Sequence, residues 1–218
     1  MPNHPDGRAW VVLAAASLLS QTAHAQPTQA LEPLDTSGRI TYFIGEGTRR
    51  SRYQISDGEL ALWALEAWER GAAGAFRLEP GPEASALLRV YFVPASYGQY
   101  GEMRATLVDG RRGATVFVRP DTDALDAEVA TLARDDPLWR DVVVYLTCLH
   151  ELGHALGLRH TADFEDIMYS FQFGGDIPAF FGRYREQVAT REDIARLNGF
   201  SPGDLAQLAG LYAREREP

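Results

Sequence analysis

Three histidines and one glutamate near position 150 are spaced so that they could hold a metal ion. His150 and His154 are four residues apart, which on a helix places them about 40° apart around the axis and about 6 Å apart along it. Both imidazoles could therefore reach one ion, and His160 would supply a third ligand. Three neutral imidazoles around a tetrahedral Zn²⁺ leave one position open for water, which is typical of catalytic zinc sites.

The glutamate would act beside such an ion. Glu151 lies one step around the helix from His150, close enough to meet a water on the metal. Zn²⁺ lowers the pKa of its water and polarises a scissile carbonyl, while a carboxylate takes the proton and returns it to the leaving amine. The residues therefore favour peptide-bond hydrolysis with Glu151 as general base. Two alternatives remain, a zinc amidase acting on cell-wall or small peptides and a catalytically silent zinc-binding module, and the intact glutamate argues against the second.

The third histidine requires the chain to turn. His160 lies six residues beyond His154, so on a continued helix it would face the opposite side. Gly157 stands where the turn is needed, because glycine adopts the left-handed conformation that ends helices without a Cβ penalty. The other two histidines, His4 and His24, are near the N-terminus. The sequence thus predicts one zinc ion and a helix that ends at Gly157.

A long helix must position the first two ligands. Asp136-Pro137 provides an N-cap followed by proline at the first helical position, and the apolar pattern after it reaches about Leu156. Cys148 on this helix would point about 160° from His150 and is interpreted as a buried apolar residue. A single cysteine excludes an internal disulfide.

The remaining chain alternates strand and helix patterns. Strands are predicted at Arg39 to Gly45, Phe76 to Leu78, Leu87 to Pro94, Met103 to Val108 and Ala114 to Val118. The last two flank Asp109-Gly110, a common hairpin turn. A capping box formed by Ser56 and Glu59 predicts a helix from about Asp57 to Arg70. Beyond the histidines we expect a loop from Tyr169 to Ala189 and two short helices, Arg191 to Leu197 and Pro202 to Tyr212.

Composition and the N-terminus define the class of protein. The 218 residues include 45% hydrophobic and 23% charged residues, as in ordinary soluble domains. The net charge of -9 makes nucleic acid an unexpected partner. Ala9 to Leu19 is an apolar run of about 11 residues, whereas a membrane-spanning helix needs about 20. We therefore predict a signal peptide over 1–25, a flexible lead-in over 26–38 and one domain over 39–218, in a secreted or periplasmic monomer without a stable membrane anchor.

The segment HELGHALGLRH resembles the metzincin signature HExxHxxGxxH. Met168, eight residues after His160, resembles the methionine of the tight turn beneath the metal in that clan, and this spacing is similar to that of matrixins. Tyr169 directly follows the methionine, whereas the ligand tyrosine of astacins lies two residues beyond it, so packing is expected for Tyr169.

The resemblance implies an α+β fold with a twisted five-stranded mixed sheet, an antiparallel edge strand, a long active-site helix and a C-terminal helix. Its edge strand would bind an extended peptide or protein substrate and corresponds to Met103, Arg104, Ala105, Thr106 and Leu107. Aromatic residues after the methionine would line an apolar specificity pocket, or would only pack their loop: Tyr169, Phe171, Phe173, Phe180, Phe181 and Tyr184. Family members also bind calcium, but no ordered calcium-loop spacing is visible.

Overall fold

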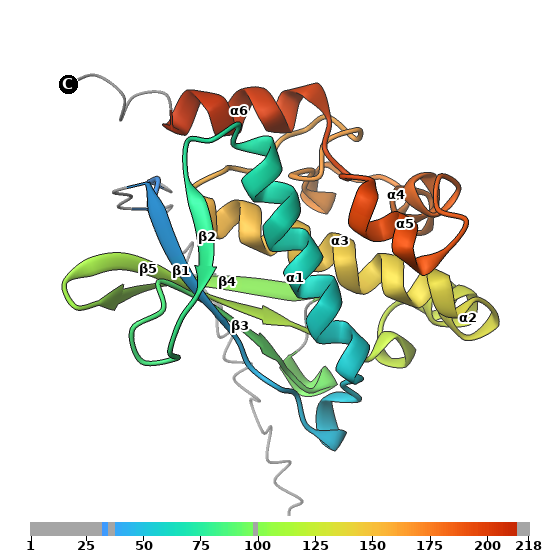
Figure 1. Cartoon of the computed structure of the whole chain (residues 1–218). Helices are drawn as coiled ribbons and strands as arrows, with labels where there is room; N and C mark the ends of the chain where they lie inside the picture. The colour runs from blue at the N-terminus through green and yellow to red at the C-terminus, as the bar shows by residue number, and fades with distance from the viewer. Residues whose placement is uncertain (1–31, 35–37, 98–99, 213–218) are drawn as a thin grey trace, which may run out of the picture.

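A five-stranded sheet carries a layer of helices on one face (Figure 1). The computed structural model describes residues 32–34, 38–97 and 100–212, so the predicted signal peptide lies outside the described residues. The strand order is β2-β1-β3-β5-β4, with β1 at Arg39–Ile44, β2 at Arg77–Pro80, β3 at Leu88–Phe92, β4 at Gly101–Val108 and β5 at Arg111–Val118. All neighbours are parallel except β4, which is antiparallel to β5. The predicted fold class, with its antiparallel edge strand, is confirmed.

The β4–β5 hairpin forms this edge. Val108 pairs with Arg111, and the two residues between them have positive φ, 50° at Asp109 and 77° at Gly110. Those angles match the primed turns that suit the twist of a two-residue hairpin. Both strands begin two or three residues earlier than predicted, because backbone pairing extends the ladder over Gly101 and other residues whose side chains give no strand pattern.

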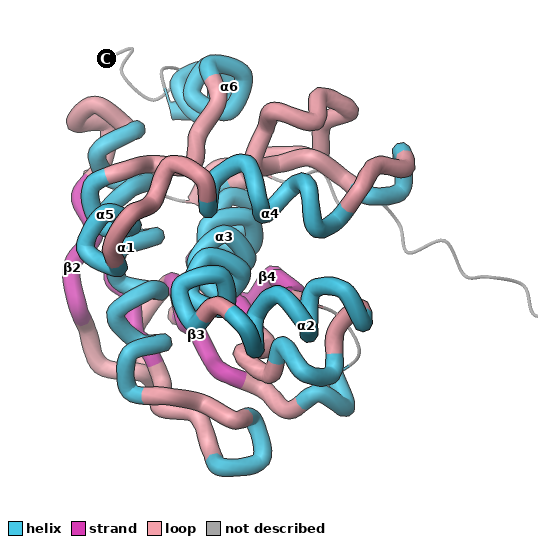
Figure 2. Tube along the Cα trace, turned by 90° about the vertical axis from the view of Figure 1, so that its right-hand side faces the viewer, coloured by secondary structure: helices cyan, strands magenta, loops and turns pink. Residues whose placement is uncertain are grey.

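The long helix α3, Pro137–Leu156, is central to the molecule. The Asp136 carboxylate caps it by accepting from the Leu138 N–H. It packs against β4, β5 and the first helix, α1, Ile55–Gly71, and the Trp68 indole of α1 donates to the Leu149 carbonyl at 2.8 Å. Figure 2 shows α3 between the strands and the last helix, α6. Cys148 is fully buried on α3.

The start of α1 differs from the prediction. Its N-cap is Gln54 and its capping partner is Asp57, which accepts the Gln54 N–H at 2.8 Å, in place of the predicted pair Ser56 and Glu59. Asp57 is fully buried and also forms a two-bond ion pair with Arg140 of α3, at 2.7 and 3.0 Å. A partner 83 residues away therefore determines which acidic residue caps the helix.

The prediction of an unbroken loop over Tyr169 to Ala189 is wrong. It contains α4, Ile177–Arg185, whose N-cap Asp176 accepts the Ala179 N–H. Another helix, α2, Ala127–Asp135, occupies a region without a predicted element, and Asp126 caps it. The predicted C-terminal helices appear as α5, Arg191–Arg196, and α6, Pro202–Tyr212. Single 3₁₀ turns lie at Arg49–Ser51, Ala95–Tyr97, Thr122–Ala124 and Phe171–Phe173.

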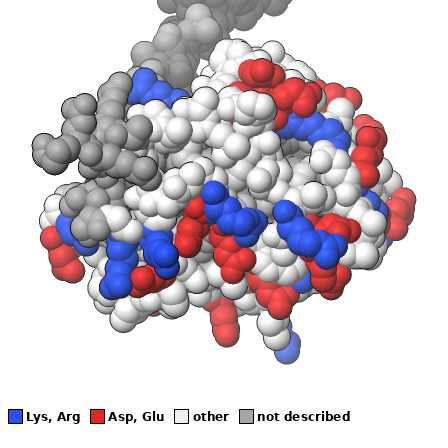
Figure 3. All heavy atoms as spheres, turned by 45° about the horizontal axis from the view of Figure 1, so that its top comes forward, with Lys and Arg blue, Asp and Glu red and all other residues white. Residues whose placement is uncertain are grey.

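Charged side chains are interspersed on the surface. Figure 3 shows arginines beside acidic residues around a broad region without charge on that face. Within the described part of the chain, no helix combines the length and apolar character that a membrane crossing requires. Leu34, inside the predicted lead-in, is fully buried and belongs to the hydrophobic core of the domain.

Candidate metal centre

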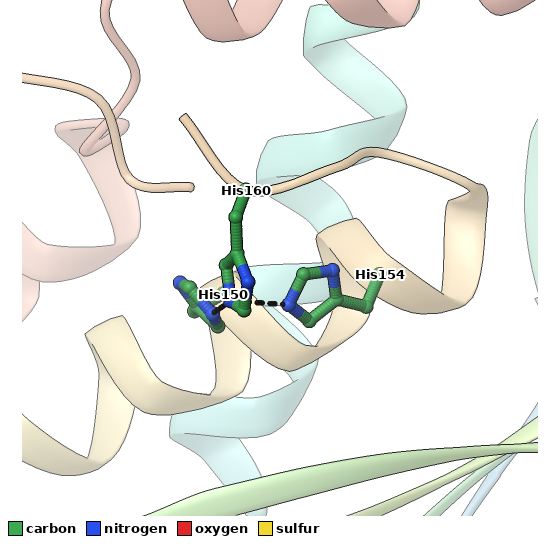
Figure 4. Close-up of side chains that lie close together, drawn as sticks. All are labelled: His150, His154 and His160. Atoms are coloured by element: carbon green, nitrogen blue, oxygen red, sulfur yellow. Dashed lines mark hydrogen bonds between the residues drawn. The ribbon is translucent and has the colours of Figure 1, made fainter. Parts of the chain in front are cut away.

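The three histidines converge at the end of α3 (Figure 4). The Nε2 atom of His160 lies 3.2 Å from Nε2 of His150 and 3.0 Å from Nε2 of His154. Tetrahedral Zn²⁺ with Zn–N bonds of 2.0–2.1 Å would separate its nitrogens by about 3.3 Å. The arrangement therefore fits a zinc ion. Among the described residues, this is the one group of His, Cys, Asp or Glu side chains found close enough to hold a metal.

Backbone carbonyls orient two of the rings. Nδ1 of His150 lies 2.7 Å from the Ile167 carbonyl, and Nδ1 of His154 lies 3.0 Å from the Leu158 carbonyl. A carbonyl only accepts, so Nδ1 carries the proton in each ring and Nε2 presents its lone pair to the shared point. This is the tautomer that zinc ligation requires.

The rings are also held neutral. Burial, followed by the neighbouring His154 ring, lowers the pKa of His150 to about 3, and burial with the charge of His160 lowers the pKa of His154 to about 4. Burial likewise lowers the pKa of His160. Neutral imidazole is the form that binds zinc, so ligation does not have to displace a proton near neutral pH.

The turn between the second and third histidines is formed by Gly157. Its φ of 105° is left-handed, and the Leu158 N–H returns to the Gly153 carbonyl at 2.9 Å, which closes the end of α3. A Cβ on Gly157 would also lie 2.8 Å from the Glu32 carbonyl oxygen. Both the conformation and the space at this position favour glycine.

Met168 packs against α3 at Gly153, between the two helical histidines in the chain. Its side chain is fully buried, and its sulfur packs where a Cβ on Gly153 of α3 would stand. Asp204 of α6 holds the turn by accepting the N–H groups of Ile167 and Met168 at 2.8 and 3.2 Å. Because the Ile167 carbonyl also accepts a hydrogen bond from the His150 ring, Asp204 fixes the peptide group that orients His150.

Asp204 was not identified from the sequence. It caps α6 reciprocally with Ser201, with bonds of 2.9 and 3.0 Å, so the capping spacing was a readable signal of a helix start. Its second role depends on tertiary contacts that the spacing does not contain.

The side chain of Glu151 packs against β4. It is 8% exposed, and a Cβ on Gly101 would lie 2.6 Å from its Cγ. Burial first, then the charge of Glu102, raises the pKa of Glu151 to about 8, while a hydrogen bond from the Met103 backbone opposes the rise. A cation held by the imidazoles would favour the ionised carboxylate. Neither Gly101 nor Glu102 was predicted from the sequence as a site residue.

A cavity of about 500 Å³ opens beside the histidines. Its walls come from β4, α3 and the segment after Met168, and its lining includes Tyr100, Thr147, His150, Glu151, His160, Tyr169, Phe171, Ile177, Phe180 and Phe181. Phe173 is 56% exposed and does not line it. Tyr184 packs on Tyr145 and donates to the Leu197 carbonyl instead. Phe173 and Tyr184 were therefore wrongly predicted to line the pocket.

The remaining predicted residues lie near the cavity. Tyr169 is buried, and its hydroxyl donates to the Gly174 carbonyl at 2.9 Å, which is a packing role. The residues from Met103 to Leu107 lie along the sheet edge on β4, with Arg104, Ala105 and Leu107 exposed. A larger cavity, about 560 Å³, lies between α1 and β2 and contains none of these residues.

Comparison with known families agrees with this geometry. The family model described as matrixin, a peptidase family, matches residues 36–175, more than half of the chain. The matched region includes the three histidines, Glu151 and Met168. Matrixins are peptide hydrolases with a catalytic zinc. The chain therefore belongs to the matrixin family.

Proposed function

We propose that this protein is a secreted zinc-dependent endopeptidase in which His150, His154 and His160 hold the metal and Glu151 is the general base. The observation that carries the proposal is the convergence of three neutral Nε2 atoms within zinc-binding distance, with a buried carboxyl beside them. When bound, zinc would supply Lewis acidity toward water and the scissile carbonyl.

Glu151 performs the proton transfers in this proposal. Its carboxylate takes a proton from the attacking water and later delivers it to the leaving nitrogen. Contact with Gly101 and the hydrogen bond from the Met103 backbone restrict the carboxyl to one position. Glu151 is 8% exposed and lines the cavity next to His150 and His160, where a substrate would lie.

The edge of β4 is the proposed substrate-binding strand. β4 pairs with β5 on one side only, so its other edge can accept an extended peptide by strand addition. The aromatic cavity next to His150 and His160 would then receive the side chain after the cleaved bond. We expect a preference for large apolar side chains at that P1′ position, because Phe180, Phe181 and Phe171 line the cavity.

The N-terminal segment supports the proposed export of the protein. Residues 1–25 have the layout of a signal peptide, with an apolar run followed by Ala23-His24-Ala25. We propose a mature chain that begins near Gln26, is secreted or periplasmic, and works as a monomer on peptide or protein substrates.

Replacing Glu151 with glutamine tests the proposal. The amide keeps the shape of the carboxyl but cannot accept the proton, so cleavage of an unfolded protein should fall by about 10²- to 10⁴-fold. Zinc content, measured by mass spectrometry, should remain one ion per chain. The control is Gln187→Leu, which changes an exposed amide side chain that bonds the Arg183 carbonyl and does not line the cavity beside the histidines.

Chelation and substrate choice separate the alternatives. A zinc endopeptidase loses activity with a chelator, regains it with Zn²⁺, and cleaves internal bonds of long chains. Cleavage of short peptides alone would favour the amidase, and zinc binding without any cleavage would favour the silent module. Full activity in the Glu151→Gln variant would place the base elsewhere.

A further inference from the structure

Of the three proposed zinc ligands, His160 is the one whose ring is held least firmly by the surrounding protein. His150 and His154 each bond a carbonyl through Nδ1. No such partner of His160 Nδ1 is found among the described residues, and the His160 ring is exposed. His160 also lies outside the helix that carries the other two. Its position therefore depends on the backbone that precedes it.

A side chain from α6 holds that backbone. The Arg159 N–H donates to Oε1 of Gln207, and Nε2 of Gln207 donates back to the Arg159 carbonyl at 3.3 Å. One amide group thus satisfies both polar groups of the residue immediately before His160. Two bonds to one rigid amide restrict both translation and rotation of the Arg159 backbone.

The helix that supplies Gln207 is itself anchored on both sides of the site. Asp204, one turn earlier, binds the backbone of the Met168 turn. Tyr212, near the end of α6, donates its hydroxyl to the Leu156 carbonyl at 2.9 Å, where α3 ends just before Gly157. Leu208 between them is fully buried. Gln207 therefore extends from a helix that is fixed both to α3, which carries the other two histidines, and to the Met168 turn. Figure 2 shows α6 above α3.

We propose that Gln207 is a positioning residue for the third zinc ligand, acting through the backbone of Arg159. This inference rests on the proposed zinc site, and it concerns a helix outside the matched residues 36–175. Without the amide, the segment between Gly157 and His160 would sample more positions, and fewer of them would place His160 Nε2 at the shared point. Metal affinity should fall, because outer partners of zinc ligands commonly contribute 10- to 100-fold to affinity.

The test compares Gln207→Leu with Gln187→Leu in the full chain. Leucine has about the same helix propensity as glutamine, so α6 should persist while both hydrogen bonds to Arg159 are lost. Gln187 also bonds a backbone carbonyl, that of Arg183 at 2.9 Å, but it does not line the cavity beside the histidines. Zinc affinity is measured by competition with a chromophoric chelator, and the visible spectrum of the Co²⁺-loaded protein reports ligand geometry. Thermal unfolding of the metal-free protein reports folding.

We expect Gln207→Leu to weaken zinc binding by about tenfold and to alter the Co²⁺ spectrum, with metal-free stability close to that of Gln187→Leu. The inference is overturned if affinity and spectrum match the wild type, or if Gln187→Leu changes them equally. A fall in metal-free stability without a change in the Co²⁺ spectrum would also overturn it. If the wild type binds no zinc in the same assay, the proposed function fails; if it binds and only Gln207→Leu is unaffected, the positioning role alone fails.

Discussion

The carboxyl group of Glu151 is confined by the strand above it. Gly101 leaves the space that Glu151 Cγ occupies, and a side chain there would meet Glu151 and Thr147 at less than contact distance. The φ of Gly101 is not positive, so close approach and not backbone conformation favours glycine here. Gly101, which has no side chain, thus determines the position of the proposed base, Glu151.

Gly101→Ala should therefore impair catalysis more than metal binding. The added Cβ, 2.6 Å from Glu151 Cγ, must push the carboxyl away, and we expect kcat/KM to fall by at least about tenfold because small displacements of a positioned group cost rate. Steady-state kinetics on a peptide substrate together with zinc titration measure the two effects. Gly182→Ala is the control, because a Cβ at Gly182 has no neighbour within 4 Å. Equal activity in both variants would refute the spatial argument.

At the scale of elements, α3 connects the sheet to the metal centre. Its N-terminus is fixed by Asp136, which caps the Leu138 N–H at 3.0 Å and pairs with Arg185 of α4 at 2.6 Å. Its C-terminus is closed by Gly157 and by the Arg112 and Tyr212 side chains, which donate to the Ala155 and Leu156 carbonyls. Both ends are thus held by side chains from other elements, which resists fraying of the turn that carries His154.

Stability should depend on pH through Asp136. Burial raises its pKa, but the bond and charge of Arg185 and the N–H groups of Leu138 and Trp139 outweigh burial, so the folded pKa is lowered. A lowered carboxyl pKa stabilises the fold above the unfolded value, about 3.9, and this contribution is lost as pH falls through the folded value.

The measurement is the Tm difference between wild type and Asp136→Asn, with zinc chelated throughout. Asparagine also caps helices, so the substitution removes mainly the charge. We expect the wild type to have the higher Tm at pH 7, with the difference shrinking below about pH 4. A difference that stays constant down to pH 3 would show that the charge of Asp136 does not contribute.

For the whole molecule, the metal centre joins parts that are distant in the chain. α3, the segment after Gly157 and the Met168 turn all meet there, and α6 closes over them. With one cysteine the chain has no internal disulfide to perform this joining. A bound ion would link the segments in the folded state only.

Removal of zinc should consequently lower thermal stability reversibly. A ligand at 1,000 times its Kd stabilises the fold by about 4 kcal/mol, which for a domain of this size corresponds to roughly 10 °C in Tm. Calorimetry with and without a chelator, followed by Zn²⁺ addition, measures the change. His160→Ala should lose most of the zinc response. Identical Tm values with and without zinc would contradict a metal that is bound only by the folded protein.

The sequence alone determined what local spacing and local geometry encode. The i and i+4 histidines with Glu151 between them, the Asp136-Pro137 start, Gly157 and the Asp109-Gly110 turn are all short-range signals. They were sufficient to predict the hairpin and the long helix, because each depends on backbone preferences over a few residues. The α+β class followed from the resemblance of HELGHALGLRH to the metzincin signature.

Only the tertiary structure decided the remainder. It placed Gly101 against Glu151, Asp204 beneath Ile167, and Gln207 beside Arg159. It also made Asp57, which pairs with Arg140, the capping partner of α1 in place of the predicted Glu59. The first three contacts join residues at least 36 positions apart, and the fourth depends on the ion pair between Asp57 and Arg140, which is equally long-range. No periodicity in the chain indicates which of many polar side chains will meet. Burial and packing make that selection, because a buried polar group is stable only where a partner reaches it.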